Sequence, residues 1–204
     1  MITIVNFGSG NVRAIANIYE RLNISFKIAD DPDTIKGAEK IILPGVGAFD
    51  QTMMSLDASG FRPVLEEQVL GRRIPVLGIC VGMQILAKKS EEGELNGLGW
   101  INGEVKKIDK TLLNNSPRLP HLGWNSIQVK KSNPLFENVE EERGFYFLHS
   151  YYFECSEDND VLSTTLYGKD FASAVNHENV YGVQFHPEKS HQNGVNILKN
   201  FAEL

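Results

Sequence analysis

The stretch that decides the fold is PVLGICVGMQIL, residues 75–86, where an apolar run meets two glycines and a cysteine. Residues 74–79 are typical of a buried strand, and GMQILAKKS (82–90) predicts a helix after it. GICVG matches the G-x-S-x-G elbow, with cysteine in the serine position and the required strand, turn and helix around it. Cys80 therefore has two interpretations. It is either a small buried hydrophobe or a nucleophile at a helix amino terminus, whose partial positive charge favours the thiolate.

Short apolar runs alternate with helical patterns on the amino-terminal side of this stretch. We expect strands at 2–5, 25–29 and 40–43, and helices at 11–22 and 61–72. Strands that alternate with helices indicate a parallel sheet with helices on both faces. An open sheet of this kind places its site in the loops at the carboxyl ends of the strands.

The carboxyl-terminal half has a different pattern. Short apolar or alternating runs separated by turn residues indicate antiparallel strands, and only the tail at 193–204 is helical. The expected strands lie within 126–131, 144–154, 160–168, 171–177 and 179–186. No linker or repeat divides the halves, so we expect one domain, residues 1–204, of the α/β class. Its open, mostly parallel sheet is flanked by helices and carries an added antiparallel layer.

Composition narrows the functional classes. The chain has 204 residues, a net charge of −6 and 23% charged residues, without the basic bias that nucleic-acid binding normally requires. Its two cysteines show no C-x-x-C spacing, so neither a disulfide framework nor a zinc site is indicated. The amino terminus lacks a secretory pattern, and no apolar run is long enough to span a bilayer. We expect a cytoplasmic protein that binds neither nucleic acid nor membrane.

One of the five histidines comes with a carboxylate at close range. In GVQFHPEKS (182–190), His186 and Glu188 are two residues apart in a stretch expected to be extended, so their side chains point to the same side. Cys80, His186 and Glu188 thus form a plausible nucleophile, base and orienting carboxylate. Cys155 has no glycine elbow around it, and we interpret it as structural.

Two glycine-rich loops follow predicted strands. PGVGAF (44–49) has peptide groups that can reorient and turn an N–H toward an oxyanion beside that of Val81, although a simple turn would look the same. FGSGN (7–11) resembles part of a dinucleotide-binding loop, but Arg13 stands where the third glycine belongs. A tight turn before a helix, or a surface turn that touches a partner, also explains this second loop.

Taken together, LGICVGMQ and the distant HPE resemble the class I (triad) glutamine amidotransferases, whose flavodoxin-like glutaminase domain has about this length. Further stretches are similar to the HisH branch of that family, the glutaminase subunits of imidazole glycerol phosphate synthase. These stretches are NFGSGNVRAI (6–15), PGVGAFD (44–50), LPHLGWN (119–125), FYFLHSYY (145–152) and GVQFHPEKS (182–190).

The resemblance implies a role for each matching residue. Cys80 would attack the carboxamide of L-glutamine, His186 would transfer protons to the departing ammonia, and Glu188 would orient His186. No cofactor and no metal are implied. The oxyanion-binding and substrate-binding positions would be Gly45, Val46, Gly47, Val81, Gln84, Ser150 and Tyr151.

The resemblance also implies a partner. An ammonia-accepting (β/α)8 synthase takes about 250 residues by itself, so the chain has no room for one. In the family the acceptor is HisF, a barrel cyclase that makes imidazole glycerol phosphate and AICAR in histidine biosynthesis, bound as a heterodimer. The docking residues would be Asn11, Arg13, Tyr146 and Lys189.

Three alternatives remain open from the sequence. EKSHQNG (188–194) is similar to HisH-like paralogues whose partner aminates a nucleotide sugar for surface polysaccharide. A catalytically silent docking protein would need none of Cys80, His186 and Glu188. A cysteine hydrolase of peptides or esters would leave LPHLGWN and HSYY without an explanation.

Overall fold

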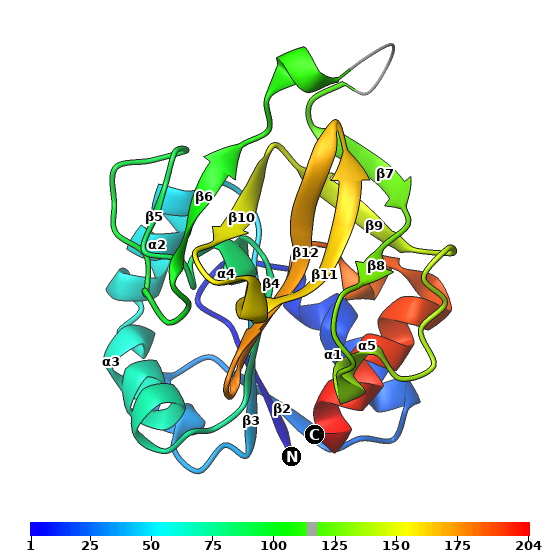
Figure 1. Ribbon diagram of the computed structural model, residues 1–204. Coiled ribbons are helices and arrows are strands. Elements are labelled where there is room, and N and C mark those ends of the chain that lie inside the picture. The colour runs from blue at the N-terminus through cyan, green and yellow to red at the C-terminus, as the bar shows by residue number, and fades with distance from the viewer. Residues whose placement is uncertain (114–117) are drawn as a thin grey trace.

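A mixed sheet forms the centre of the molecule (Figure 1). The computed structural model describes residues 1–113 and 118–204. Within these residues, eleven strands form one sheet in the order β2–β1–β3–β4–β13–β12–β10–β6–β5, with β11 and β8 joined beside β12. The parallel part consists of β2 (Phe26–Ala29), β1 (Ile2–Val5), β3 (Lys40–Gly45), β4 (Val76–Cys80) and β13 (Val180–Val183). The α/β class and the mostly parallel sheet with an added antiparallel part are confirmed.

The antiparallel part begins at β13, the strand at which the parallel and antiparallel parts of the sheet meet. This strand runs parallel to β4 and antiparallel to its neighbour on the other side, so the expectation that 179–186 would be purely antiparallel is half right. The strands beyond it are β12 (Lys169–His177), β10 (Tyr151–Cys155), β6 (Gly103–Lys107), β5 (Lys89–Ser90), β11 (Val161–Tyr167) and β8 (Gln128–Val129). These strands pair antiparallel, except that β5 runs parallel to β6. Sequence patterning predicted neither β6 nor β5, whose residues fall inside the helix expected over 82–90.

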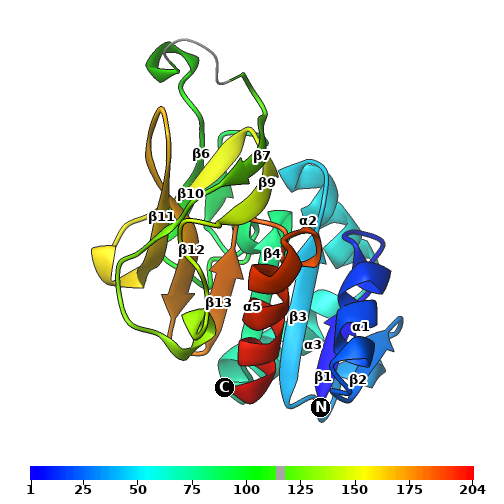
Figure 2. The same cartoon turned by 90° about the vertical axis from the view of Figure 1, so that its right-hand side faces the viewer.

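Helices cover both faces of the sheet, as Figure 2 shows. One face carries α1 (Val12–Arg21) and α5 (His191–Glu203), joined where the Tyr19 hydroxyl donates to the Leu198 carbonyl at 3.0 Å. The other face carries α2 (Phe49–Ala58), which was not predicted, and α3 (Phe61–Glu66), which continues as a π-helical turn (Glu67–Gly71). No helix in the described ranges is long and apolar enough to cross a membrane. Short 3₁₀ turns lie at Pro32–Ile35, Lys110–Leu112, Pro134–Phe136, Asp158–Asp160 and Pro187–Lys189.

The helix expected over 82–90 is wrong in length. The observed helix, α4, spans only Val81–Gln84. Beyond it, the backbone carbonyls of residues 85–88 accept N–H groups from the segment 97–101, at 2.7–3.1 Å. Ile85, Leu86 and Ala87 are fully buried. A segment that is apolar all round suits enclosure by a neighbouring chain segment better than an amphipathic surface helix, and the tertiary contacts override the local propensity.

A separate two-stranded ribbon lies beside the main sheet. It consists of β7 (His121–Asn125) and β9 (Phe145–His149), paired antiparallel, and we call it the β7–β9 ribbon. Side chains alternate across it, as expected for strands. Leu122, Trp124, Tyr146 and Leu148 share the outer face, whereas His121, Phe147 and His149 are buried beneath it. Strand β7 was not predicted, although its residues are those of the LPHLGWN motif.

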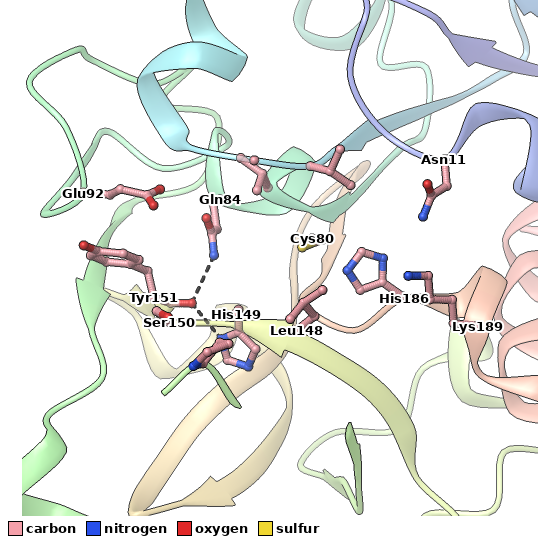
Figure 3. A pocket seen from close by; sticks show the side chains of 14 residues that line it. Asn11, Cys80, Gln84, Glu92, Leu148, His149, Ser150, Tyr151, His186 and Lys189 are labelled. Atoms are coloured by element: carbon pink, nitrogen blue, oxygen red, sulfur yellow. Dashed lines mark hydrogen bonds between the residues drawn. The ribbon is translucent and has the colours of Figure 1, made fainter. Parts of the chain in front are cut away.

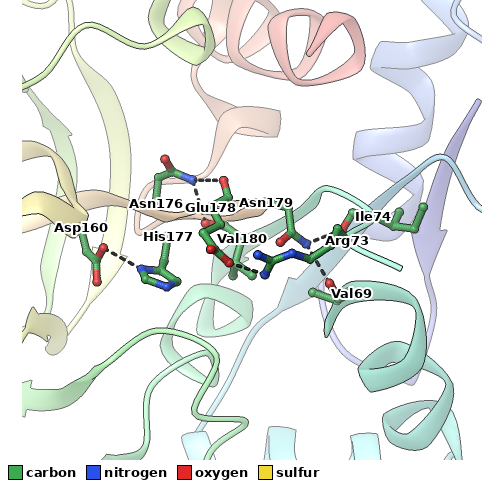
Figure 4. A network of polar contacts seen from close by, with 9 residues as sticks. All are labelled: Val69, Arg73, Ile74, Asp160, Asn176, His177, Glu178, Asn179 and Val180. Atoms are coloured by element: carbon green, nitrogen blue, oxygen red, sulfur yellow. Dashed lines mark hydrogen bonds and ion pairs between the residues drawn. The ribbon is translucent and has the colours of Figure 1, made fainter. Parts of the chain in front are cut away.

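Asparagine side chains hold the turn between β12 and β13 against the lower end of β4 (Figure 4). Asn176 Nδ2 donates to the carbonyls of Glu178 and Val180, at 2.8 and 3.1 Å. Asn179 Nδ2 donates to the carbonyls of Val69 and Ile74, both at 2.9 Å. The contacts of Asn179 join residues more than a hundred positions apart and place β13, which leads directly to His186, beside the strand that carries Cys80.

Candidate active site

Cys80 lies at the sharp turn between β4 and α4. Its backbone has φ 55° and ψ −113°, a conformation rarely adopted by a residue with a side chain. The residue is 4% exposed. A strained residue at this turn matches the geometry of a nucleophile elbow, in which the reactive atom stands at the carboxyl end of the central strands. Val81, the next residue, begins the short helix α4, and the first N–H groups of a helix have no carbonyl partner within that helix.

The turn is possible because glycines face one another across it. A Cβ on Gly82 would lie 1.9 Å from the Leu43 carbonyl oxygen, and a Cβ on Gly45 would lie 2.4 Å from the Gly82 nitrogen. Gly45 is also the register partner of Cys80 on the neighbouring strand. The backbone of the elbow therefore packs directly on the end of β3, where the PGVG loop begins.

His186 and Glu188 meet at the end of β13. His186 Nδ1 lies 2.9 Å from Glu188 Oε1, and the two side chains are 4% and 2% exposed. The pairing arises because Pro187 starts a 3₁₀ turn, rather than from the extended chain expected from the sequence. Asn11 Nδ2 donates to the same carboxylate oxygen at 2.7 Å. Asn11 is the N-cap residue of α1 but makes no capping bond with its side chain, so that amide serves Glu188 instead of its own helix.

The charges around His186 outweigh its burial. Desolvation by itself would lower the pKa of His186, but hydrogen bonds and charge interactions with Cys80 and Glu188 raise that pKa to about 10. Burial likewise acts to raise the pKa of Glu188, and the contacts with His186 and Asn11 lower it overall. Nδ1 of His186 bonds the carboxylate, which leaves Nε2 to serve Cys80. An imidazolium held between two potential anions is thus the stable form near neutral pH.

The PGVG loop was expected to supply an oxyanion N–H only after one of its peptide groups reorients, and in this structure the polar groups of Val46 are bonded to Ser9. The Val46 N–H donates to Ser9 Oγ at 2.9 Å, and Ser9 Oγ donates to the Val46 carbonyl at 3.0 Å. Both polar groups of Val46 are therefore engaged away from Cys80. Gly47 has φ 102°, a conformation that only glycine adopts readily. An oxyanion donor from this loop requires a peptide rotation that breaks the contacts with Ser9.

A cavity of about 530 Å³ opens in front of the cysteine (Figure 3). It lies between the elbow, the PGVG loop and the end of the β7–β9 ribbon. Every predicted oxyanion-binding and substrate-binding position except Gly45 lines it, and Gly45 lies directly behind the elbow. The lining residues are Asn11, Val46, Gly47, Cys80, Val81, Gln84, Glu92, Pro120, Leu148, His149, Ser150, Tyr151, His186 and Lys189.

Gln84 is held in one orientation at the back of the cavity. Its Nε2 donates to the Tyr151 carbonyl and to Gln184 Oε1, both at 3.0 Å. With its amide nitrogen engaged twice, Gln84 directs Oε1 away from these partners, as an acceptor at the cavity wall. Gln184 Nε2 in turn lies 3.9 Å from the sulfur of Cys80.

Several cavity residues were missed from the sequence. Glu92 comes from the loop after β5, and its Oε2 accepts the Phe49 N–H at the start of α2, at 2.8 Å. Leu148 and His149 line the opposite wall, and Gln184 and Ser9 act from behind it. LPHLGWN and HSYY were signals for this wall, but LPHLGWN was assigned no structure, and HSYY was placed inside one expected strand, 144–154, where the structure has the end of β9 and the start of β10. Glu92 has no local signal, because it enters the site through a loop.

Of the four predicted docking residues, Asn11 and Lys189 line the cavity, Tyr146 lies beside Lys189, and Arg13 lines a neighbouring surface pocket together with Asn11. Lys189 and Tyr146 lie together, with the Lys189 ammonium 5.4 Å from the centre of the Tyr146 ring, at the mouth of the cavity. Asn11 lies inside the cavity and contacts Glu188. Arg13 is exposed at the start of α1 and lies outside the cavity lining. Within the described residues, no group of three or more histidine, cysteine and acidic side chains could hold a metal ion.

Comparison with known proteins gives a consistent family. The family model of class-I glutamine amidotransferases matches residues 3–204. The imidazole glycerol phosphate synthase subunit HisH of Leptospira borgpetersenii is 51% identical over 204 residues, covering all of both chains. The protein of the same name from Bdellovibrio bacteriovorus is 50% identical over 209 residues, again with full coverage of both chains.

A solved structure agrees at the level of the fold. The structure of PurLQS from Thermotoga maritima contains a chain that matches with a TM-score of 0.71 and 17% identity. The alignment covers 99% of this chain and 96% of that one. At this identity the likeness concerns the arrangement of strands and helices alone.

Proposed function

The chain belongs to the class-I glutamine amidotransferase family, and from this premise we propose that it is the glutaminase subunit of an imidazole glycerol phosphate synthase. It hydrolyses L-glutamine to glutamate and ammonia with Cys80, His186 and Glu188. It passes the ammonia to a HisF-type (β/α)8 cyclase of histidine biosynthesis. The observation that carries the proposal is the strained Cys80 at the elbow, facing a cavity with the His186–Glu188 pair beside it.

The first half of the reaction forms a thioester. The sulfur of Cys80 attacks the carboxamide carbon of glutamine, and the carbonyl oxygen becomes an oxyanion near the Val81 N–H. The carbon–nitrogen bond then breaks, and the nitrogen leaves as ammonia with a proton from Nε2 of His186. The raised pKa of His186 supports this step, because the imidazolium is present at neutral pH before the attack.

The second half releases glutamate. His186, now neutral, takes a proton from a water molecule as that water attacks the thioester carbon. Collapse of the second tetrahedral intermediate breaks the carbon–sulfur bond and returns Cys80 to the thiolate. Throughout both halves Glu188 accepts the Nδ1–H of His186, which keeps Nε2 directed at the reacting atoms.

The cavity has groups for the amino-acid end of glutamine. Glu92 lines the cavity, and its Oε2 already accepts the Phe49 N–H. The other oxygen of Glu92 and the outward Oε1 of Gln84 suit an α-ammonium group, since both only accept hydrogen bonds when Glu92 is ionised. Their positions away from His186 (Figure 3) leave the carboxamide end of the substrate directed toward Cys80.

The mouth of the cavity supports a docked partner. Leu122 and Trp124 on the outer face of the β7–β9 ribbon are 62% and 44% exposed, and Leu148 and Val46 continue this apolar surface to the cavity rim. Large exposed apolar side chains grouped in this way are typical of a protein interface. Ammonia released into water would be protonated and lost, so a partner that covers this mouth fits the proposed reaction.

A second candidate keeps the chemistry and changes the acceptor to a nucleotide sugar. It is favoured by the position of His191 in the KSHQNG stretch, whose ring stacks on Trp124 with centroids 5.1 Å apart. The part of the sequence that resembles sugar-aminating paralogues therefore lies on the proposed docking face, where it could select a different partner.

Reconstitution tests the proposal and separates the two acceptors. The purified chain is mixed with the HisF-type cyclase of the same genome and its nucleotide substrate, and both glutamate and imidazole glycerol phosphate are measured. We expect the partner to stimulate glutamine hydrolysis by at least about tenfold and the cyclised product to appear. Cys80→Ala should abolish glutamate release while still binding the cyclase. Stimulation only by a partner from a sugar pathway would support the second candidate, and parent-rate hydrolysis by Cys80→Ala would exclude the proposed nucleophile.

The two hydrogen bonds between Ser9 and Val46 predict low glutaminase activity of the chain in the absence of its partner. Ser9→Ala removes both contacts with Val46, each worth about 1 kcal/mol, so the loop can rotate an N–H toward Cys80 more often. We expect basal glutaminase activity without partner to rise about tenfold, with little change in the stimulated rate. Ser9→Thr, which keeps the hydroxyl, is the matched control. Equal basal rates for the Ala variant and the parent would contradict a holding role for Ser9.

A further inference from the structure

Two buried histidines form a chain of hydrogen bonds that the proposed chemistry does not use. His121 and His149 are direct cross-strand partners in the β7–β9 ribbon, 3% and 6% exposed. His121 Nδ1 lies 2.9 Å from His149 Nε2, and His149 Nδ1 lies 2.8 Å from the Tyr151 carbonyl oxygen. The His121 ring is stacked between Phe147 and Tyr167, with centroid distances of 4.7 and 3.9 Å.

The Tyr151 carbonyl, at one end of this chain of hydrogen bonds, determines which ring nitrogens of His149 and His121 carry a hydrogen. The Tyr151 oxygen can only accept, so Nδ1 of His149 carries a hydrogen and Nε2 of a neutral His149 is an acceptor. His121 must then donate from Nδ1, which makes its own Nε2 an acceptor. Asn125 Nδ2, at 3.2 Å, supplies a hydrogen to that atom.

Both rings are therefore neutral with the hydrogen on Nδ1. A second proton on His149 would set its Nε2–H against the Nδ1–H of His121. The apolar and neutral surroundings agree, since burial lowers the pKa of His121 to about 4 and that of His149 to about 3. The arrangement satisfies all four ring nitrogens without any charge.

The chain of hydrogen bonds ends at the Tyr151 carbonyl, which also orients Gln84. The Tyr151 carbonyl accepts from His149 Nδ1 and from Gln84 Nε2 together. His149 thus holds this carbonyl in the direction that lets it capture the Gln84 amide nitrogen and leave Oε1 toward the cavity. Tyr151 and Gln84 both line that cavity, so an error in the orientation of the carbonyl would be transmitted to the surface that meets the substrate.

We propose that His149, supported by His121, is a positioning residue for glutamine binding: the neutral pair holds the Tyr151 carbonyl and, through it, the orientation of Gln84. This inference rests on the proposed glutaminase function. It assigns the two histidines of LPHLGWN and HSYY to the affinity for substrate, and it gives them no part in proton transfer, which belongs to His186.

Two substitutions at one position separate the hydrogen bond from the rest of the side chain. His149→Asn places an amide nitrogen where Nδ1 stood and can still donate to Tyr151, whereas His149→Gln places its polar group near the site of Nε2 and loses that donor. Kinetics are measured on the full chain with its cyclase partner. For His149→Gln we expect the KM for L-glutamine to rise at least about tenfold while kcat falls less than about threefold. His149→Asn should recover most of the parent KM.

The matched control is His177→Gln, on β12, whose half-exposed ring pairs with Asp160 (Figure 4) and lies outside the cavity lining. It should keep the parent KM. Direct titration of L-glutamine into the complex that contains Cys80→Ala, with and without His149→Gln, checks that the effect is on binding. Nitrogen-15 NMR of the unmodified chain should show His121 and His149 neutral and protonated at Nδ1 between about pH 6 and 8.

The outcomes separate the positioning role from the proposed function. Unchanged KM in His149→Gln, or NMR signals of Nε2-protonated or charged rings, would overturn the positioning role while leaving glutaminase activity in place. Absence of glutamate release by the unmodified complex would instead overturn the proposed function, and the role in glutamine binding with it. A loss of kcat in His149→Gln at unchanged KM would assign His149 to the chemical step and contradict the proposal.

Discussion

The buried histidine beside Cys80 and the buried histidine pair of the β7–β9 ribbon differ in charge state, although burial acts on the pKa of all three rings in the same direction. Desolvation acts to lower the pKa of His186, of His121 and of His149 alike. Near Cys80 and Glu188 it is outweighed, and the pKa of His186 rises to about 10. In the β7–β9 ribbon the other two rings face a carbonyl, an amide and aromatic rings, and their pKa values fall to about 4 and about 3.

The comparison teaches that burial alone does not decide the state of a histidine. What decides it is whether the buried ring meets ionisable partners or neutral dipoles. A ring that stays charged beside a sulfur and a carboxylate suits proton transfer. A ring that stays neutral, with its hydrogens directed by fixed acceptors, suits positioning. The following predictions remove one member of each environment in turn.

Among changes around the histidines, the largest effect should come from removing the carboxylate that, together with Cys80, raises the pKa of His186. Glu188→Gln retains the size of the side chain but takes away the carboxylate, so Nδ1 of His186 loses its charged acceptor and its pKa should fall. By analogy with orienting carboxylates in other triads, we expect kcat for glutamine hydrolysis to drop about 10²- to 10⁴-fold. Glutamate release by the partner-bound chain measures it.

Glu178→Gln is the matched control for this change, because Glu178 is an exposed carboxylate paired with Arg73 (Figure 4) and lies outside the cavity lining. Its rate should equal that of the parent. A loss of less than about threefold in Glu188→Gln would mean that His186 keeps its orientation and charge without the carboxylate. The Glu188 carboxylate would then not explain why the pKa of His186 is raised while the pKa values of His121 and His149 are lowered.

The neutral state of His121 and His149 should make the free energy of unfolding depend on pH in the acid range. The folded pKa values of His121 and His149 lie below the ordinary 6.5, so between about pH 6.5 and 4.5 the unfolded chain takes up protons that the folded chain refuses. The free energy of unfolding should therefore fall with decreasing pH, with a slope approaching two protons, about 2–3 kcal/mol per pH unit. The raised pKa of His186 has the opposite sign, since its stabilisation is complete below 6.5 and is lost as the pH rises through about 10.

Urea unfolding at intervals of about half a pH unit measures this slope. His149→Asn should reduce it by about one proton, whereas His177→Gln serves as the control for a histidine with an exposed ring. A slope near zero between about pH 6.5 and 5 in the unmodified chain would mean that the buried pair carries charge in the folded state, against the arrangement of its hydrogen bonds.

The smallest effect should come from removing the Asn11 side-chain amide, a neutral group that contacts the His186–Glu188 pair. Asn11→Ala removes the 2.7 Å contact with Glu188 Oε1 but leaves His186 bonded to that oxygen. We expect kcat to fall about five- to tenfold, in keeping with roughly 1 kcal/mol for one hydrogen bond, and affinity for the cyclase to stay unchanged. Arg13→Ala, two residues further along the chain, is the control for kcat alone, because Arg13 is itself a predicted docking residue. Weaker partner binding at an unchanged kcat would return Asn11 to the docking face predicted from sequence.

Much of the sheet could be predicted because its signals are local. The apolar runs at 2–5, 40–43 and 74–79 correspond to strands β1, β3 and β4, which are almost entirely buried, and their patterns needed no knowledge of neighbouring strands. The helix expected over 82–90 failed for the opposite reason. Its carbonyls are bonded by residues 97–101, and no pattern within the segment announces that contact. Strands β5, β6 and β7 and helix α2 were missed because their patterns are weak until the pairing partner or covered face is known.

The sequence by itself determined which residues are available for chemistry: a cysteine between glycines after a buried strand, and a histidine and glutamate separated by one proline. These are short-range patterns, and steric constraint makes them specific. Only the tertiary structure decided that Ser9 holds Val46 away from Cys80, that Asn11 serves Glu188, and that two histidines 28 positions apart share one neutral chain of hydrogen bonds. These contacts and charge states depend on how deeply each group is buried and on which distant residues folding brings beside it. No single stretch of the sequence contains that information.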